Sequence, residues 1–468
     1  MKNVKTYLFL TCLLAGCIRH YEAPAVSMPA EYTEGKTFMV KSSEGDLRTW
    51  WKQFNDSLLN SLIEESLNTN YDVRIAEAAV RESRAQYQVQ SSPLWPQLNA
   101  VGAEERARLS QTLTFSAFLG PPLQNFYAFG FDASWELDFF GKNRSAKEAA
   151  YFDYEASIEN LRDIQVTMVA EVALQYVNIR AFQQRLKVMR ELEKVRADLV
   201  NLNQVNFEAG LLDNIALEQS RSQLEQTRAQ IPVLETSLKQ SLFSLAILLG
   251  RQPENIEKEF ETTREIPRAA GLIPLGLPSD LLYRRPDLRM AEKQLYAAMA
   301  NVKLAKADLF PSISLTGLFG YESSFAKQLF KWPSRTWSIG PGMNWPLFSG
   351  GRVLGNIKAM KAAQQQAVLS YQKAIISALQ DVESSLVAYA NEELRQNHLS
   401  KALQDDKTSL DLSTDLYQAG LSDFSPVLRT DERVLADEDN VLQSQQALMT
   451  NLISLYKALG GGWEEKND

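Results

Sequence analysis

The sequence predicts an α+β membrane protein that combines long α-helical coiled coils with a transmembrane β-barrel shared between chains. Three observations predict it. Two stretches of about 65 residues read as uninterrupted helix. Short segments alternate between apolar and polar residues, as strands do. The whole pattern occurs twice along the chain, which indicates an internal duplication.

The duplication is visible residue by residue. Trp135 and Trp345 are 210 residues apart, and Gly141 matches Gly351 at the same offset. Phe207-Glu208-Ala209-Gly210-Leu211-Leu212-Asp213 matches Tyr417-Gln418-Ala419-Gly420-Leu421-Ser422-Asp423. Earlier in each half the offset is 215, since Pro96 matches Pro311. We therefore expect one structural unit used twice, with a five-residue length difference in a loop.

The charge balance and the hydropathy of the chain exclude some classes of protein. The 468-residue chain has 49 Lys and Arg against 57 Asp and Glu, a balance that argues against nucleic-acid binding. No window contains the roughly 18 apolar residues that a membrane-spanning helix needs.

The N-terminus predicts export and lipid attachment. Lys2 and Lys5 precede an apolar run, and Leu14-Ala15-Gly16-Cys17 is typical of a bacterial lipobox, so residues 1–16 would be a signal peptide. Cys17 is the candidate for lipid attachment, including palmitate. Ile18 follows it rather than Asp, which in such lipoproteins points to the outer membrane. The alternative is an ordinary cleaved signal with an incidental cysteine.

Residues 17–50 are polar and predict a tether, and residues from Trp50 to about Ser92 predict helix up to Pro93. From Tyr127 the odd positions are apolar and the even ones are small or acidic, including Asp132, Glu136 and Asp138. The second half repeats this alternation around Trp337 to Leu347, with a further strand from Ile313 to Tyr321. This pattern fits a half-buried soluble sheet, but aromatic clusters opposite acids favour a transmembrane β-barrel with a polar lumen.

Each half supplies two strands, and four strands cannot close a barrel, so several chains must share one. From Lys142 to about Asn206 there is no Pro or Gly, and apolar residues recur every 3.5 residues, as in a coiled coil. Such a helix is roughly 100 Å long at about 1.5 Å per residue. We expect a first repeat over 51–260 and a second over 261–468, each with a helix, a β-hairpin and a long helical hairpin, and a C-terminal tail closes the second.

Four motifs stand out: the stretch from Gly276 to Leu288, the junction from Trp345 to Arg352, Tyr417-Gln418-Ala419-Gly420, and the stretch from Leu455 to Trp463. In this order they resemble the TolC family of outer-membrane efflux proteins, in particular its lipoprotein branch (NodT/OprM-like), which serves RND pumps. The resemblance implies a homotrimer whose three chains build a twelve-stranded barrel in the outer membrane above a helical tunnel in the periplasm. It also implies a periplasmic adaptor (a membrane fusion protein) and an inner-membrane RND pump as partners.

The same resemblance places a periplasmic gate near the second helical turn. The candidate gate residues are Asp423, Ser425, Arg429, Asp431 and Glu432. Rings of like charge repel, so we expect cross-chain pairs such as Arg429 with Asp431 or Glu432 to hold the gate closed. Ser425 and Arg429 occupy positions where a bulky apolar residue and an acid are usual in OprM-like proteins. The alternative is an ordinary solvated helix face.

The three acids of the strand, Asp132, Glu136 and Asp138, are the candidate residues of the barrel lumen. Their alternative place is the junction between barrel and helices, where they would pair with Lys142 or Arg144.

No catalytic or metal site is predicted, and no cofactor. The chain has only two histidines, His20 and His398, and no phosphate-binding Lys-Ser or Lys-Thr follows Gly460-Gly461-Gly462. We therefore expect a passive channel for exported small molecules rather than an enzyme. The rival functions are a duct for type I protein secretion or metal-ion efflux, and a non-conducting coiled-coil envelope lipoprotein.

Overall fold

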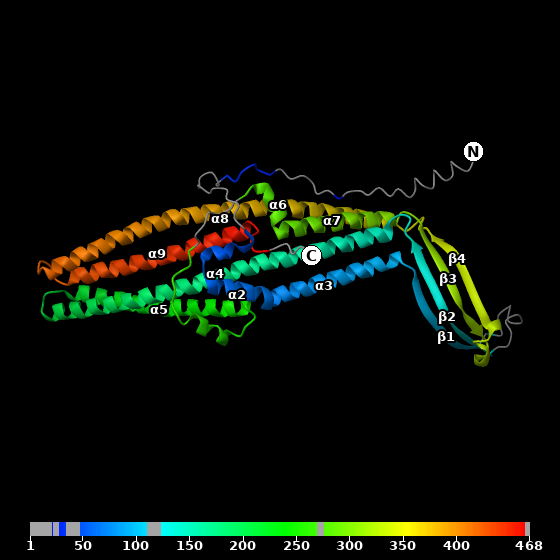
Figure 1. The fold of residues 1–468 in the computed structure, drawn as a ribbon, viewed down its shortest axis with the longest axis horizontal. Coiled ribbons are helices and arrows are strands. Elements are labelled where there is room, and N and C mark those ends of the chain that lie inside the picture. The colour runs from blue at the N-terminus through cyan, green and yellow to red at the C-terminus, as the bar shows by residue number, and fades with distance from the viewer. Residues whose placement is uncertain are drawn as a thin grey trace. The chain divides into compact units, whose positions relative to one another are not determined.

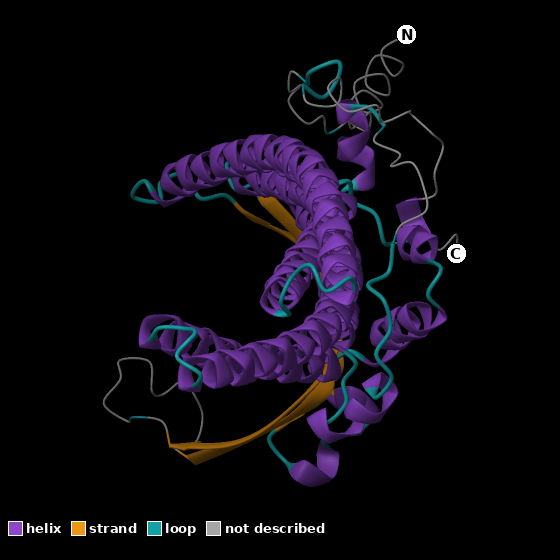
Figure 2. Ribbon diagram, turned by 90° about the vertical axis from the view of Figure 1, so that its left-hand side faces the viewer, coloured by secondary structure: helices purple, strands orange, loops and turns teal. Residues whose placement is uncertain are grey.

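The computed structural model describes residues 21, 28–33, 47–108, 110, 123–268 and 276–463. The predicted signal peptide, Cys17 and His20 lie outside the described residues, as does most of the predicted tether. Helices make up most of the described chain, and the strands gather in one sheet (Figures 1 and 2).

The first half contains four α-helices, two strands and two short 3₁₀ helices. In chain order they are η2 (Leu47–Phe54), α2 (Ser57–Thr69), α3 (Tyr71–Ser91), η3 (Ser92–Leu94), β1 (Gln97–Arg108), β2 (Leu123–Leu137), α4 (Lys142–Glu208) and α5 (Asn214–Leu248).

The second half follows the same plan after a connecting segment. Its elements are η5 (Pro253–Asn255), η6 (Glu257–Phe260), η7 (Pro278–Asp280), α6 (Leu281–Arg284), α7 (Pro286–Ala307), β3 (Ser312–Ser323), η8 (Ala326–Gln328), η9 (Trp332–Ser334), β4 (Arg335–Asn344), α8 (Arg352–Gln418) and α9 (Ser425–Ala458). The helices α4 and α8 have 67 residues each and start 210 positions apart, as the duplication predicts.

The expected single helix from Trp50 to Ser92 is instead three pieces. Asp56 caps α2 by accepting hydrogen bonds from the backbone N–H groups of Leu58 and Leu59 at 2.9 and 3.2 Å. Asn70 separates α2 from α3, and its side-chain oxygen accepts the N–H of Asp72 at 2.7 Å. Side chains that satisfy the free N–H groups of a first helical turn favour a new start over a continuous helix. The apolar pattern alone did not reveal these two caps.

The long helices end in the same way in both halves. Gly210 and Gly420 have φ of +71° and +72°, a backbone region that is open to glycine at little cost. The next residues, Leu211 and Leu421, donate their N–H to carbonyls five residues back, at 2.8 and 2.9 Å. This is a Schellman ending, and it lets the chain leave α4 and α8 abruptly and begin the returning helix.

The four strands form one antiparallel sheet in the order β1-β2-β3-β4. The central pair joins the two halves, with Phe131 opposite Phe319 and Gly130 opposite Gly320. The strand β1, which begins directly after Pro96, is as long as β3, at 12 residues. The outer edges of β1 and β4 have no strand neighbour within the described chain.

A repeated hydrogen bond holds the end of each hairpin against the helix before it. The indole N–H of Trp135 donates to the carbonyl of Leu94, and that of Trp345 donates to the carbonyl of Leu309, both at 3.1 Å. The duplicated tryptophans therefore make the same contact in each half.

The chain divides into two compact units that do not coincide with the two repeats. The first comprises Met1–Val26, Arg81–Ala156 and Ala291–Gln372, and contains the sheet. The second comprises Ser27–Val80, Ser157–Met290 and Lys373–Asp468, and contains the helical hairpin tips.

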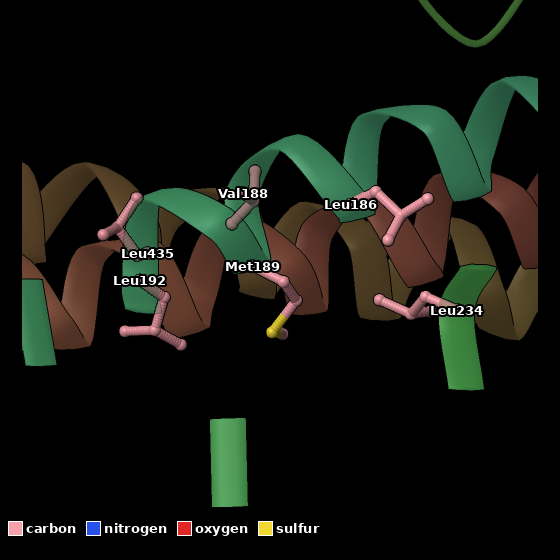
Figure 3. Packing of buried hydrophobic residues seen from close by; sticks show 6 residues of the cluster. All are labelled: Leu186, Val188, Met189, Leu192, Leu234 and Leu435. Carbon is pink, nitrogen blue, oxygen red and sulfur yellow. The ribbon is translucent and has the colours of Figure 1, made fainter. Parts of the chain in front are cut away.

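A core cluster in the second unit joins helices of both repeats. Figure 3 shows its six side chains, which come from α4, α5 and α9: Leu186, Val188, Met189, Leu192, Leu234 and Leu435. Because Leu435 belongs to the second repeat, the cluster packs α9 against the first helical hairpin.

Among the described residues, no single helix has the length and apolar composition to cross a membrane. Only α5 together with the segment Pro253–Phe260 passes that test, as a pair bent by 106°.

Candidate functional site

The sheet has two chemically different faces. On one face, apolar side chains from all four strands stand exposed, among them Leu98, Phe129, Phe131, Phe319, Trp337, Ile339 and Met343. Trp337 and Ile339 are 69% and 70% exposed. The opposite face carries Ser, Thr, Gly and acidic residues. A large exposed apolar patch needs a partner or a lipid environment, and the alternation is typical of a membrane barrel wall.

Two of the three predicted lumen residues lie on the polar face. Asp132 accepts a hydrogen bond from the side-chain amide of Asn99 in the neighbouring strand, at 3.3 Å. Glu136 lies opposite Ser314 and lines a cavity of about 150 Å³ where the strands meet the helices.

Asp138 lies beyond the end of β2. Its place is therefore the junction between the strands and the helices, which was the alternative to the lumen. Its carboxylate accepts the backbone N–H of Asn143 at 3.1 Å and that of Arg144 at 2.8 Å. It also pairs with the Arg144 guanidinium at 3.2 Å. A carboxylate on the first N–H groups of a helix stabilises its start, so Asp138 anchors α4 to the sheet.

The second helical turn brings three predicted gate residues around one groove of about 590 Å³. Asp423, Ser425 and Arg429 line it together with residues of the first turn, including Leu211 and Leu212. Asp423 also accepts the N–H of Ser425 at 3.1 Å and so orders the start of α9. The two turns of the duplication thus meet at one place.

The other two predicted gate residues face the first helical hairpin. Glu432 accepts from the Arg196 guanidinium of α4 at 2.7 Å, and Arg196 also donates to the carbonyl of Gln223 in α5 at 2.9 Å. Asp431 is partly buried, and this burial, reinforced by the charge of Glu191, raises the pKa of its carboxyl. Glu432 thus has a partner within its own chain, and the expected pairing with Arg429 of a sister chain stays a prediction.

Sequence reasoning missed the two arginines that bind α4 to α9. Arg185 makes a two-pronged contact with Asp439 at 2.7 and 3.2 Å, and both side chains are largely buried. Arg196 makes the second connection, to Glu432. One signal was available, because Asp439 interrupts the apolar stripe formed by Val434, Leu435 and Val441 in α9. An acid within such a stripe indicates a buried partner.

Among the described residues, no group of three or more His, Cys, Asp and Glu side chains is placed to hold a metal ion. His398 lies on the exposed surface of α8.

Comparison with known proteins defines the class. The family model described as outer membrane efflux protein matches residues 62–251 and 277–461, so the chain belongs to this family. The two matched ranges correspond to one stretch from each half of the duplication. The family consists of efflux ducts and is not a family of enzymes.

Individual relatives match nearly end to end. The chain is 31% identical to "Probable outer membrane lipoprotein SilC" of Salmonella typhimurium, covering 97% of each chain. It is also 31% identical to "Antibiotic efflux pump outer membrane protein ArpC" of Pseudomonas putida, covering 99% of this chain and 96% of that protein. The structure of the outer-membrane channel OprN superposes with a TM-score of 0.86 at 28% identity, covering 95% of this chain and 99% of that one.

The protein is therefore an outer-membrane channel component of an efflux system, with its helical tunnel in the periplasm. The predicted fold class is confirmed: the chain supplies four strands to a barrel shared by a trimer. A non-conducting envelope spacer is not favoured.

Proposed function

We propose that three copies of this chain form the passive exit duct of an RND-type tripartite pump, anchored by acyl chains on Cys17 and joined to a periplasmic adaptor. The observation that carries the proposal is the four-stranded sheet with one exposed aromatic face and two open edges. Open sheet edges are not tolerated in lipid, and sister chains would cover them. The inner-membrane pump supplies the energy.

The acyl anchor is supported by the chain that follows it. Tyr21 donates its hydroxyl to Glu148 at 2.5 Å, and Lys303 lies 3.7 Å from the centre of its ring. These contacts hold Tyr21, four residues after Cys17 in the sequence, within the same compact unit that contains the sheet.

The Cys17→Ala variant should lose all labelling by radioactive palmitate in growing cells, because no thiol remains at the lipobox. Cys12→Ala is the matched control and should label normally, since Cys12 lies in the predicted signal peptide. Palmitate on the Cys17→Ala variant would overturn the assignment of the lipid site.

We propose that Asp132 and Glu136 face the lumen and favour cations. The polar face of the described strands carries four acids and no Lys or Arg: Glu105, Asp132, Glu136 and Glu322. Acidic rings in a pore attract cations and repel anions.

In planar bilayers under a KCl gradient, the Asp132→Asn/Glu136→Gln double variant should lower the cation-to-anion permeability ratio by about twofold or more, since charges lining a channel raise the local counter-ion concentration. The measurement is the reversal potential. Glu104→Gln, on the other face of β1, is the control and should leave it unchanged. An unchanged reversal potential in the double variant would remove these two acids from the lumen.

We propose that the adaptor contacts the helical tips. Leu211 and Leu421 occupy equivalent turns, and each is 77% exposed, which is unfavourable in water for a leucine pair repeated around a trimer. Exposed apolar residues of this kind suit a protein partner such as the adaptor.

The test is efflux in cells that carry the cognate adaptor and pump. The Leu211→Asp/Leu421→Asp double variant should lose at least tenfold in drug or ion resistance, because charge would replace apolar contact area. Its trimer should form in the outer membrane to the same extent as that of the wild type, which shows that the duct is folded. Full resistance in this variant would argue against tip docking.

The substrate is best described as small exported molecules selected by the pump. SilC and ArpC bear the names of an outer membrane lipoprotein and an antibiotic efflux component, and another relative, 30% identical over 97% of this chain, is "Cation efflux system protein CusC" of Escherichia coli. A wet polar lumen is compatible with such different cargoes.

A further inference from the structure

The basic residues of the described strands lie at one end of the sheet, on its two edge strands β1 and β4. The described strands contain three Lys or Arg residues, and all of them lie on the apolar face: Arg106, Arg108 and Arg335. All three lie towards the ends of the strands that are remote from α4 and α8. The charged residues on the polar face of the described strands, in contrast, are all acids.

The position of Arg335 coincides with the limit of the apolar band. Along β4, the exposed apolar residues run from Met343 to Trp337, and Arg335 follows. Eight residues separate Met343 from Arg335, which is roughly 26 Å at about 3.3 Å per residue. Because the strands of such barrels tilt by about 35–45°, this length spans roughly 20 Å of membrane height, which is most of the lipid-facing band of about 25 Å. Arg335 therefore lies at the boundary where hydrocarbon gives way to headgroups.

Aromatic side chains surround this boundary. The Arg335 guanidinium lies 4.2 Å from the centre of the Trp332 ring and donates to the Trp332 carbonyl at 3.0 Å. Phe330 packs against Phe129 and Tyr321, with ring centres 5.9 Å apart in each case. Aromatic rings at headgroup level are typical of the interfacial girdle, and here they orient a cation.

These cations have no carboxylate partner within the part of the chain that the structure describes. Arg335 is held by a carbonyl and a ring, and Arg106 and Arg108 make no ion pair among the described residues. Glu104 is the one acid on this face of the described strands and offsets only part of the charge. Exposed cations at a lipid boundary attract anionic headgroups.

The orientation of the chain in the outer membrane determines which lipid leaflet the three arginines face. The strands continue into α4 and α8, which form the periplasmic tunnel, so the opposite strand ends face the cell exterior. The outer leaflet there consists of a glycolipid whose glucosamine headgroup carries phosphates. We propose that Arg106 and Arg108 at one edge of the sheet, and Arg335 with the Trp332 ring at the other edge, bind the phosphate groups of outer-leaflet lipopolysaccharide. The inference rests on the outer-membrane location and does not depend on the gate or the pump.

The test uses the purified full-length trimer in detergent and lipopolysaccharide reduced to bisphosphorylated lipid A with its inner sugars. The triple variant Arg106→Gln/Arg108→Gln/Arg335→Gln should bind this lipid on the order of 100-fold more weakly, because each basic side chain near an anionic lipid surface contributes about fivefold. Arg335→Lys, which keeps the charge, should bind nearly as well as wild type. Native mass spectrometry or lipid-dependent thermal stabilisation gives the affinities.

The matched control is Arg81→Gln/Lys358→Gln/Lys361→Gln, which removes the same charge from exposed positions of α3 and α8 and should bind normally. Enzymatic removal of the lipid phosphates should reduce binding to wild type to the level of the triple variant. Equal binding of the triple variant and wild type would overturn the proposal, as would equal binding of phosphatidylglycerol and the glycolipid to wild type. The triple variant should keep wild-type conductance in planar bilayers, which would show that a change in lipid binding does not come from loss of the folded channel.

Discussion

Replacing Gly130 by valine should prevent assembly of the trimeric barrel. Gly130 lies opposite Gly320 where the two repeats pair. A Cβ at Gly130 would lie 2.7 Å from the Cα of Gly320 and 2.7 Å from the carbonyl oxygen of Phe319. Both are backbone atoms, so no side-chain rotation can relieve the contact. We expect a cost of about 3 kcal/mol per chain, at the upper end of overpacking penalties, and three chains share it in one barrel.

The measurement is the fraction of heat-modifiable trimer in outer-membrane preparations. Gly340→Val is the control, since Gly340 lies on the same face, in β4, and a Cβ there meets nothing within 4 Å. Gly340→Val should assemble nearly as well as wild type. If the Gly130→Val protein gave as much trimer as wild type, the β2–β3 junction would not be the tight contact that the structure shows.

Removing the Glu432 carboxylate should open the periplasmic end. Arg196 joins three helices, because it bonds to Glu432 of α9 and, through Gln223 and Thr227, to α5. The Glu432→Ala variant loses charge-assisted hydrogen bonds worth about 2 kcal/mol and leaves a partly buried guanidinium with fewer partners. We propose that α9 then moves away from the first hairpin and widens the groove lined by Asp423, Ser425 and Arg429.

Single-channel conductance of the Glu432→Ala protein should rise several-fold over wild type in planar bilayers. Glu218→Ala removes an exposed acid that pairs with Arg221 within α5, and it should leave conductance unchanged, since exposed pairs contribute little. A Glu432→Ala channel with wild-type conductance would show that this connection does not hold the gate. Asp431, whose pKa is raised by burial and by the charge of Glu191, would then be the next residue to change.

The local features of this fold were readable from sequence because short-range chemistry fixes them. The glycines at 210 and 420 marked the ends of the long helices, and the alternation after Tyr127 marked a strand with two unlike faces. The caps at Asp56 and Asn70 were missed because a capping side chain does not interrupt the apolar pattern around it. Asp138 was assigned by alternation to the lumen or to the junction, and only its contacts with the first turn of α4 place it at the junction.

The sequence by itself determined the duplication, the long paired helices and the amphipathic strands. The apolar periodicity and the Gly and Pro residues that end helices are local properties of the chain. Tertiary structure alone decided which charges meet: Glu432 with Arg196, Asp439 with Arg185, and the isolated arginines at the outer rim of the sheet. Partners separated by more than 200 residues leave no periodic trace in the chain. Their pairing follows from how the helices of one repeat pack on those of the other, which only folding in three dimensions sets.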